Sequence, residues 1–274
     1  MSFVNGLLRP TFDALLRPLS GFPPMVGLLI VSLIVSVGML LVFKATSNQP
    51  KLEAVKRQIH ACLFEIRLFN DDLYAILRAQ VEILGHNLRY LGLSLVPMLW
   101  MLAPILLVIA QLQFHYGYEG LRPGQDFLVQ VQLAAPERFT RPAASLEAPP
   151  GLAIETPAVF IPSLGQLAWR LRAADWGEYD LKLRVDGQEY TKSVQVAHGL
   201  RRRSPVRLAA GFLDELLYPA EAPLPKGSPV ASISVGYPEA SVSLLGWRVH
   251  WLVVFFVLSI VFAFALRSRF GVVL

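Results

Sequence analysis

Apolar positions are concentrated in three long blocks rather than spread evenly along the chain. Residues 25–43 carry no charged side chain, and residues 91–113 and 249–266 are comparable, apart from His250 in the third block. About 20 apolar residues in a helix cross a ~30 Å hydrocarbon core. We therefore expect transmembrane helices over residues 25–44, 91–114 and 247–267. Buried core helices of a water-soluble protein are the alternative.

The tail before the first block, residues 1–24, has a helical pattern of its own. Leu8, Phe12 and Leu15 recur at helical spacing, with Arg9 and Asp13 on the other side. This pattern predicts an amphipathic helix lying in the membrane interface; a disordered tail is the alternative. Consecutive prolines at 23 and 24 are expected to turn the chain into the first span. We expect that span to be a retained anchor rather than a cleaved signal peptide.

The polar stretch of residues 45–90 alternates apolar steps of four and three. The repeat runs through Val55, Ile59, Cys62, Ile66, Phe69, Leu73, Ile76, Gln80, Ile83 and Asn87. This is the spacing of a coiled-coil seam. A straight helix of that length would extend ~60 Å, yet both ends must return to one membrane surface. Asn70, Asp71 and Asp72 are turn and cap residues, so they are predicted to form the tip of a helical hairpin. A helix lying flat on the bilayer is the alternative.

Residues 115–246 change to the period of β-strands. Apolar positions alternate over 127–133 and 179–185, and Asp186 and Gly187 then separate two such runs. A two-residue Asp-Gly turn is a strong hairpin signal and predicts Leu183 opposite Tyr190. Further strands are expected at 159–161, 169–171 and 233–237, with a short helix at 208–218. The fold class is therefore an α-helical membrane protein carrying an antiparallel β-sandwich, with an immunoglobulin-like arrangement as one option.

Charge sets the expected orientation. The 274 residues carry a formal net charge of +5 and only 16% charged side chains. The segment after the first block holds Lys44, Lys51, Lys56, Arg57, Arg67, Arg78 and Arg89. Short basic loops stay cytoplasmic. We therefore expect an integral protein of a prokaryotic inner membrane, with the N-terminus and residues 115–246 outside. The hairpin and the tail, residues 268–274, are expected inside, although Arg9 and Arg17 argue mildly against this.

Motifs of enzymes and cofactor sites do not occur. The five histidines are scattered, Cys62 is the single cysteine, and no metal, phosphate or nucleophile pattern appears. We expect no enzyme activity, no cofactor and no metal, and +5 is ordinary for a membrane protein rather than a sign of nucleic-acid binding. Arg201, Arg202 and Arg203 are interpreted as an exposed basic loop, with lipid headgroups or an acidic partner as the alternative ligands.

A few polar side chains lie in or beside the spans. The candidates for a client-binding groove are Lys44, Ser32, Ser36, Gln111 and Gln113, because polar groups within a membrane usually face protein or water. The alternative is structural: the serines bond to their own helix, the glutamines lie at the interface, and Lys44 extends to the headgroups. Two prolines, at 97 and 104, are expected to interrupt the second span.

The order of these elements resembles the Oxa1 superfamily, which includes YidC-type insertases and shorter three-span relatives. The resemblance rests on the three spans, Lys44 and the hairpin, and covers about half of the chain; the β-domain would be an insertion. It implies a cytosol-facing polar groove and a role in membrane-protein insertion or assembly. The implied partners are lipids and client membrane proteins, with the ribosome as a further candidate. A non-catalytic accessory subunit of a larger membrane complex, docking through the hairpin and the β-domain, is the alternative.

Overall fold

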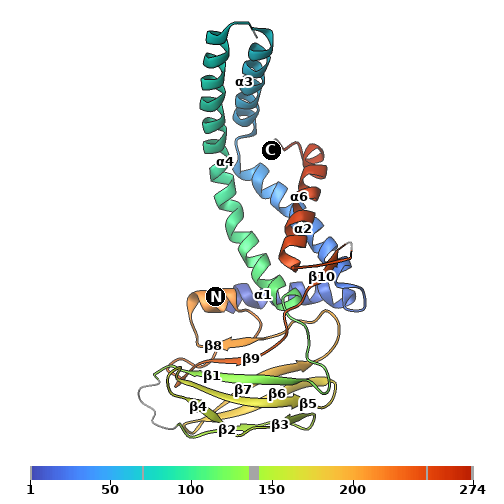
Figure 1. The fold of residues 1–274 in the computed structure, drawn as a ribbon, viewed down its shortest axis with the longest axis vertical. Coiled ribbons are helices and arrows are strands. Elements are labelled where there is room, and N and C mark those ends of the chain that lie inside the picture. The colour runs from blue at the N-terminus through green and yellow to red at the C-terminus, as the bar shows by residue number, and fades with distance from the viewer. Residues whose placement is uncertain (1, 70, 136–141, 245, 273–274) are drawn as a thin grey trace. The chain divides into compact units, whose positions relative to one another are not determined.

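The computed structural model describes residues 2–69, 71–135, 142–244 and 246–272, which form two compact units (Figure 1). The β unit comprises residues 1–28 and 107–254, and the helical unit comprises residues 29–106 and 255–274. Within the described residues, three helices are long and apolar enough to cross a membrane. They are α2 (Pro24–Thr46), α4 (Leu73–Tyr116) and α6 (Trp251–Phe270).

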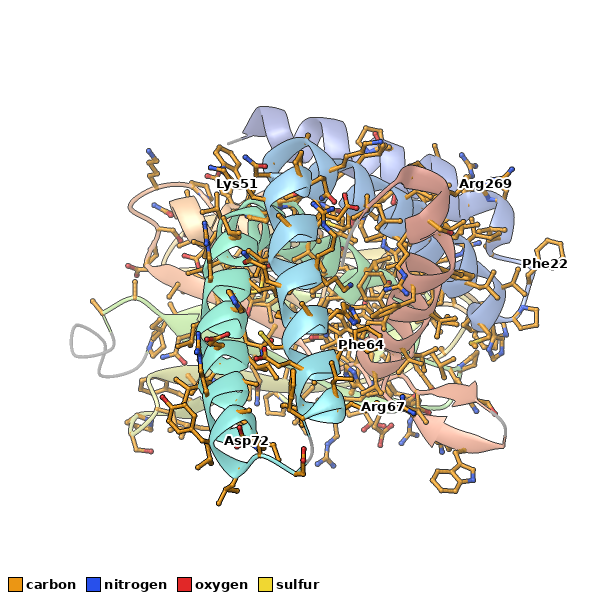
Figure 2. The ribbon with its side chains drawn as sticks, turned by 90° about the horizontal axis from the view of Figure 1, so that it is seen from above. Phe22, Lys51, Phe64, Arg67, Asp72 and Arg269 are labelled. Carbon is orange, nitrogen blue, oxygen red and sulfur yellow. The ribbon has the colours of Figure 1, made fainter. Side chains whose placement is uncertain are left out.

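The helical unit is dominated by two antiparallel helices that lie side by side, α3 (Gln49–Leu68) and the first part of α4 (Figures 1 and 2). The helix does not break at residue 90, where the hairpin was expected to end and the second span to begin. The second arm of the hairpin and the span form one 44-residue helix, α4. The expectation that Pro97 and Pro104 interrupt it is wrong: both lie inside α4. A proline removes one backbone donor, and the turns around it can keep the helix continuous.

A small core holds the base of this unit together. Leu40 and Phe43 of α2, Leu52 of α3 and Val272 after α6 are buried against one another. Partly buried side chains of α4 and α6 surround them: Tyr90, Leu93, Met101, Ala263, Leu266 and Phe270. The cluster joins the end of α2 to the base of the hairpin and to the end of α6.

Among the described residues, the β unit contains antiparallel strands in a six-stranded and a three-stranded sheet, plus one two-stranded hairpin. The strands of the six-stranded sheet are β1 (Asp126–Leu133), β3 (Leu152–Ile154), β4 (Val159–Ile161), β5 (Gln166–Ala173), β8 (Val206–Leu208) and β9 (Val230–Val235). Its order is β3-β5-β1-β9-β8, with β4 also paired to β5. The smaller sheet has the order β2-β6-β7, from β2 (Ala144–Glu147), β6 (Gly177–Val185) and β7 (Gln188–Val196).

Inward side chains of the two larger sheets share one core. Val129 and Trp169 from the six-stranded sheet and Leu183 and Val194 from the three-stranded sheet belong to the same buried cluster. The predicted pairing of Leu183 with Tyr190 is confirmed. Asp186 and Gly187 both have positive φ, 52° and 79°, which a tight hairpin turn of this hand requires.

Three boundaries differ from the sequence expectations. The strand expected at 233–237 is β9 and ends at Val235, and the helix expected at 208–218 is reduced to α5 (Phe212–Leu217). The third span does not begin at residue 247, because Trp247–Val249 is strand β11, paired with β10 (Val242–Leu244). Aromatic and β-branched residues favour that strand, and the helix begins only at Trp251.

The N-terminal segment is helical, as expected. Helix α1 (Ser2–Leu16) is followed by one 3-10 turn, η1 (Arg17–Leu19), and α2 then begins at Pro24. Leu16 at the end of α1 is almost completely buried. The polar side chains of α1 contact other residues of the β unit.

Candidate functional site

The hairpin tip is a short turn between α3 and α4. Helix α3 ends at Leu68, and α4 begins at Leu73 (Figure 2). A carboxylate oxygen of Asp72 accepts hydrogen bonds from the backbone N–H groups of Tyr74 and Ala75, at 2.9 and 3.2 Å. Asp72 is therefore the N-cap of α4. Asp71 is exposed in the turn, and Asn70 lies outside the described residues.

The contact between the two arms follows the predicted pattern on α3 and only in part on α4, where Ile76 and Ile83 are half-buried. Cys62 is buried, and its Sγ lies 3.9 Å from a carboxylate oxygen of Glu82 on α4. On α4, Ala79 is buried, whereas the predicted seam positions Gln80 and Asn87 are exposed. The repeat cannot keep its phase through a turn, because residues there leave the helix and the next helix starts with a new rotation.

Large apolar side chains are exposed around the tip. We define the tip patch as Phe64, Leu68, Leu73, Tyr74 and Leu77, which are 68%, 74%, 70%, 76% and 53% exposed. Large contiguous apolar surfaces are rare on soluble monomers and usually mark binding sites. These residues lie at the end of the hairpin away from its base core. Exposed apolar side chains continue along α4 at Val81, Leu84 and Leu88, so the tip patch is the end of a longer apolar face. It is a candidate binding surface for an apolar segment.

Ser32 and Ser36 lie together in α2 and are both buried. The Ser36 hydroxyl lies 2.6 Å from the carbonyl oxygen of Ser32 and 2.9 Å from that of Ser259 on α6, within donating distance of both. The Ser32 hydroxyl has no hydrogen-bond partner among the described residues. Small polar residues of this kind allow close packing of membrane helices. The pair belongs to the α2–α6 contact rather than to an open surface.

Lys44 caps a helix. Its Nζ is exposed and donates a 2.7 Å hydrogen bond to the carbonyl oxygen of Phe270, the last residue of α6. A cation at a helix C-terminus satisfies a free carbonyl and the negative end of the helix dipole. This contact gives Lys44 a structural role at the C-terminal end of α6.

The two glutamine candidates lie in the β unit and not with Lys44 and the serines. Gln111 is 1% exposed, and its side-chain carbonyl oxygen has no partner among the described residues. Its backbone carbonyl lies 3.0 Å from Nδ1 of His115. Gln113 is half-buried, and its side chain occupies the space where a Cβ at position 117 would lie, which requires Gly117.

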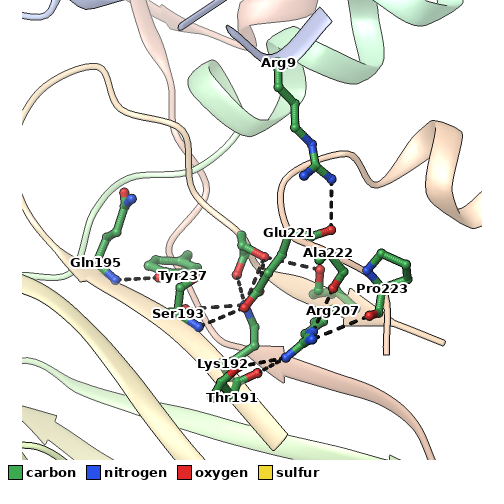
Figure 3. Close-up of polar contacts among 12 residues, drawn as sticks. Arg9, Thr191, Lys192, Ser193, Gln195, Arg207, Glu221, Ala222, Pro223 and Tyr237 are labelled. Atoms are coloured by element: carbon green, nitrogen blue, oxygen red, sulfur yellow. Dashed lines mark hydrogen bonds and ion pairs between the residues drawn. The ribbon is translucent and has the colours of Figure 1, made fainter. Parts of the chain in front are cut away.

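A buried charged cluster that sequence reasoning missed lies on β7 (Figure 3). The ammonium of Lys192 donates to a Glu221 carboxylate oxygen at 2.6 Å and to the backbone carbonyl oxygen and hydroxyl of Ser204 at 2.7 and 3.0 Å. The other Glu221 oxygen accepts from the backbone N–H of Ser193 at 3.1 Å. Burial lowers the pKa of Lys192, and the Glu221 carboxylate opposes this shift. The alternation of β7 carried the signal, because Lys192 lies between Tyr190 and Val194 on the inward face.

The arginine run is not the exposed loop that was expected. Arg203 is buried and donates to the carbonyl oxygens of Tyr118 and Gly199, both at 2.7 Å. Arg202 is only 24% exposed and pairs with Asp13 of α1 at 2.8 Å. Arg201 alone of the three is well exposed, and it pairs with the Glu178 carboxylate at 2.8 Å.

Asp13 joins three segments of the β unit. One carboxylate oxygen lies 3.2 Å from Nε2 of His115, and the other pairs with Arg202. The hydrogen bond with His115 is the main cause that lowers the pKa of Asp13, and Arg202 adds to it, while burial opposes. Arg9, one turn earlier on α1, donates to the backbone carbonyl oxygen of Glu221 at 3.0 Å. The polar side of α1 is therefore held against the rest of the β unit by these contacts.

No protein-family model matches this chain, and no curated protein matches it. The candidate function therefore depends on the chain's own residues and on the plan of its elements.

Proposed function

We propose that this chain is an integral membrane protein that assists the insertion or assembly of other membrane proteins, as an insertase-like or chaperone-like factor. The observation that supports it best is the tip patch. A hairpin arm held at its base by a core, with apolar side chains exposed at its end, presents a surface suited to an apolar segment that is not yet in the membrane.

In this proposal the three apolar helices cross the inner membrane, and residues 115–246 form a β-sandwich outside it. The basic hairpin lies in the cytoplasm, where client membrane proteins emerge from ribosomes. Exposed Arg67 beside the tip patch is outnumbered by the exposed carboxylates of Asp71 and Asp72, so the apolar side chains rather than a positive charge would bind the client. Membrane lipids surround the largely exposed apolar faces of α2, α4 and α6.

Site-specific crosslinking tests the client role. A photoreactive amino acid at Leu73, in the tip patch, is expected to crosslink stalled nascent membrane proteins made in the presence of inverted membrane vesicles. The same probe at Arg57, which is exposed near the middle of α3, serves as the matched control. Replacing Phe64 and Leu77 by serine should reduce crosslinking from Leu73 severalfold. Equal crosslinking at both positions, unaffected by the serines, would contradict client binding at the tip.

An accessory-subunit role is the second candidate, and the polar positions of the spans favour it. The Ser36 hydroxyl is bonded within the α2–α6 contact, and Lys44 is bonded to the end of α6. These groups therefore have structural partners and do not need a client. Purification in a mild detergent separates the two roles: varied nascent chains support the insertase-like role, and one stoichiometric set of membrane proteins supports the accessory role.

A further inference from the structure

A basic cavity of about 430 Å³ lies in the β unit, between α1, the end of α4 and the loop after β7. Its charged and polar lining includes Arg17, Arg201, Arg202, His115, Asp13 and Glu178, with Ser20 and Gln195. Its size lies within the range of small-ligand sites. Three guanidinium groups and His115 face two carboxylates, which leaves a net positive charge.

Two of the guanidinium groups have donors to spare. Arg17 has no side-chain hydrogen bond or ion pair among the residues that the structure describes. Arg202 pairs with Asp13 through Nη2, whereas its Nη1 is buried and has no partner in the described part of the chain. A buried donor without a partner costs free energy unless an acceptor reaches it. Phosphate oxygens are the acceptors that guanidinium groups bind best.

The cavity is close in sequence to the ends of two apolar helices. Ser20 lies four residues before Pro24, the first residue of α2, and His115 is the penultimate residue of α4. If α2 and α4 cross the bilayer, these residues lie within the few ångströms of the headgroup layer that border the hydrocarbon core. That layer holds the phosphate groups of phospholipids.

We propose that this cavity binds the phosphate group of an anionic phospholipid, held by Arg17 and Arg202, with the lipid tails along the apolar helix ends. The bound lipid would anchor α1 to the β unit together with the existing Asp13 contacts. This site is separate from the tip patch and does not depend on client binding.

Native mass spectrometry of the full chain in a mild detergent tests the proposal by titration with a short-chain phosphatidylglycerol. The wild type is expected to bind one lipid molecule more tightly than any further lipid molecules. Arg17→Gln is expected to weaken binding at least tenfold, and it breaks no hydrogen bond or ion pair among the described residues, so its fold should be retained. Arg170→Gln is the matched control: it removes the same charge from an exposed position on β5 that does not line the cavity.

The competing outcomes are distinct. Equal lipid binding by Arg17→Gln, Arg170→Gln and wild type would overturn the proposal, since the lipid would then be an ordinary annular lipid. Inorganic phosphate would overturn the proposal in favour of a free-anion site if it displaced the lipid at a concentration equal to the dissociation constant of the lipid. Binding of phosphatidylglycerol that inorganic phosphate does not displace supports the proposal. Arg202→Gln should weaken binding too, with near-ultraviolet circular dichroism as the check that the β unit is still folded.

Discussion

At the residue scale, Lys192 and Glu221 form a buried ion pair in which each charge compensates the other. Lys192 is fully excluded from solvent, and Glu221 is mostly buried beside it. Glu221 belongs to the segment after α5, so the pair attaches that segment, and through Arg9 also α1, to β7. Such a pair contributes to the specificity of the packing more than to net stability.

Glu221→Gln should therefore destabilise the β unit strongly. It leaves the Lys192 ammonium buried without a counter-charge, which costs about 3 kcal/mol or more in buried pairs. Thermal unfolding followed by near-ultraviolet circular dichroism measures the loss. The double variant Lys192→Met with Glu221→Gln removes the buried charge and should recover much of the stability. A single variant as stable as wild type would show that the ion pair is not buried in the folded protein.

Asp13 predicts an acid-dependent weakening of α1 docking. Its pKa is lowered in the folded state, first by the hydrogen bond with His115, so ionised Asp13 stabilises the fold. That contribution is present above the unfolded pKa of about 4 and is lost as the pH falls through the lower folded pKa. Unfolding temperatures of wild type should fall in that window more steeply than those of Asp13→Asn. Parallel profiles would argue against the interaction.

Lys44 predicts a local effect on α6. Lys44→Met removes the bond to the carbonyl oxygen of Phe270, and exposed helix-terminus contacts contribute roughly 0.3–1 kcal/mol. We expect faster hydrogen exchange in the last turn of α6, with the crosslinking of clients at the tip unchanged. Lys44→Arg, which keeps a donor, should behave like wild type. A loss of client crosslinking in Lys44→Met would restore Lys44 as a groove residue.

At the scale of elements, the cap of α4 and the packing of its first half against α3 define the hairpin. Asp72→Ala removes the acceptor for two backbone N–H groups and should cost about 1 kcal/mol. Hydrogen exchange of residues 73–76 should increase. Asp71→Ala is the control, because the Asp71 carboxylate has no hydrogen bond among the described residues. Similar exchange in both variants would contradict the cap.

The proximity of α3 and α4 can be tested through the single cysteine. Cys62 lies beside Glu82, whereas a continuous helix would separate these residues by ~30 Å. In Glu82→Cys, a short bifunctional thiol reagent should link the two cysteines within one chain. Val81→Cys is the control, because Val81 is 71% exposed on a different side of α4. Linkage in Val81→Cys alone would show that the arms meet through other faces.

At the scale of the whole molecule, the basic hairpin and the β unit are expected on opposite sides of the membrane. Cysteines at Asp72 and at Gln188, in a background without Cys62, should react with an impermeant thiol reagent from opposite sides. Gln188 is chosen rather than the neighbouring turn residue Gly187, because Gly187 has φ +79° and a side chain there would strain the turn. Reaction of Gln188→Cys from the cytoplasmic side would invert the proposed topology.

The sequence alone determined the features that depend on local periodicity and turn chemistry. Apolar blocks predicted the three long helices, and Asp186 with Gly187 predicted the register that places Leu183 opposite Tyr190. Asp72 was located at the turn of the hairpin for the same reason, since capping is a property of neighbouring residues. Among the three-residue strands, β4 was predicted, whereas β3 and β10 were missed, because so short a run carries little pattern and pairs only when a neighbouring strand is present.

Only the tertiary structure decided what the polar candidates contact. Ser36 reaches a carbonyl of α6, Lys44 reaches the end of the same helix, and Arg202 reaches α1. Each partner is distant in sequence, and the type of a polar side chain does not indicate which distant residue it will contact. The phase of α4 was decided in the same way, because Ala79 rather than Gln80 faces α3. The fold places such groups by the burial of apolar neighbours, and their hydrogen bonds follow from that packing.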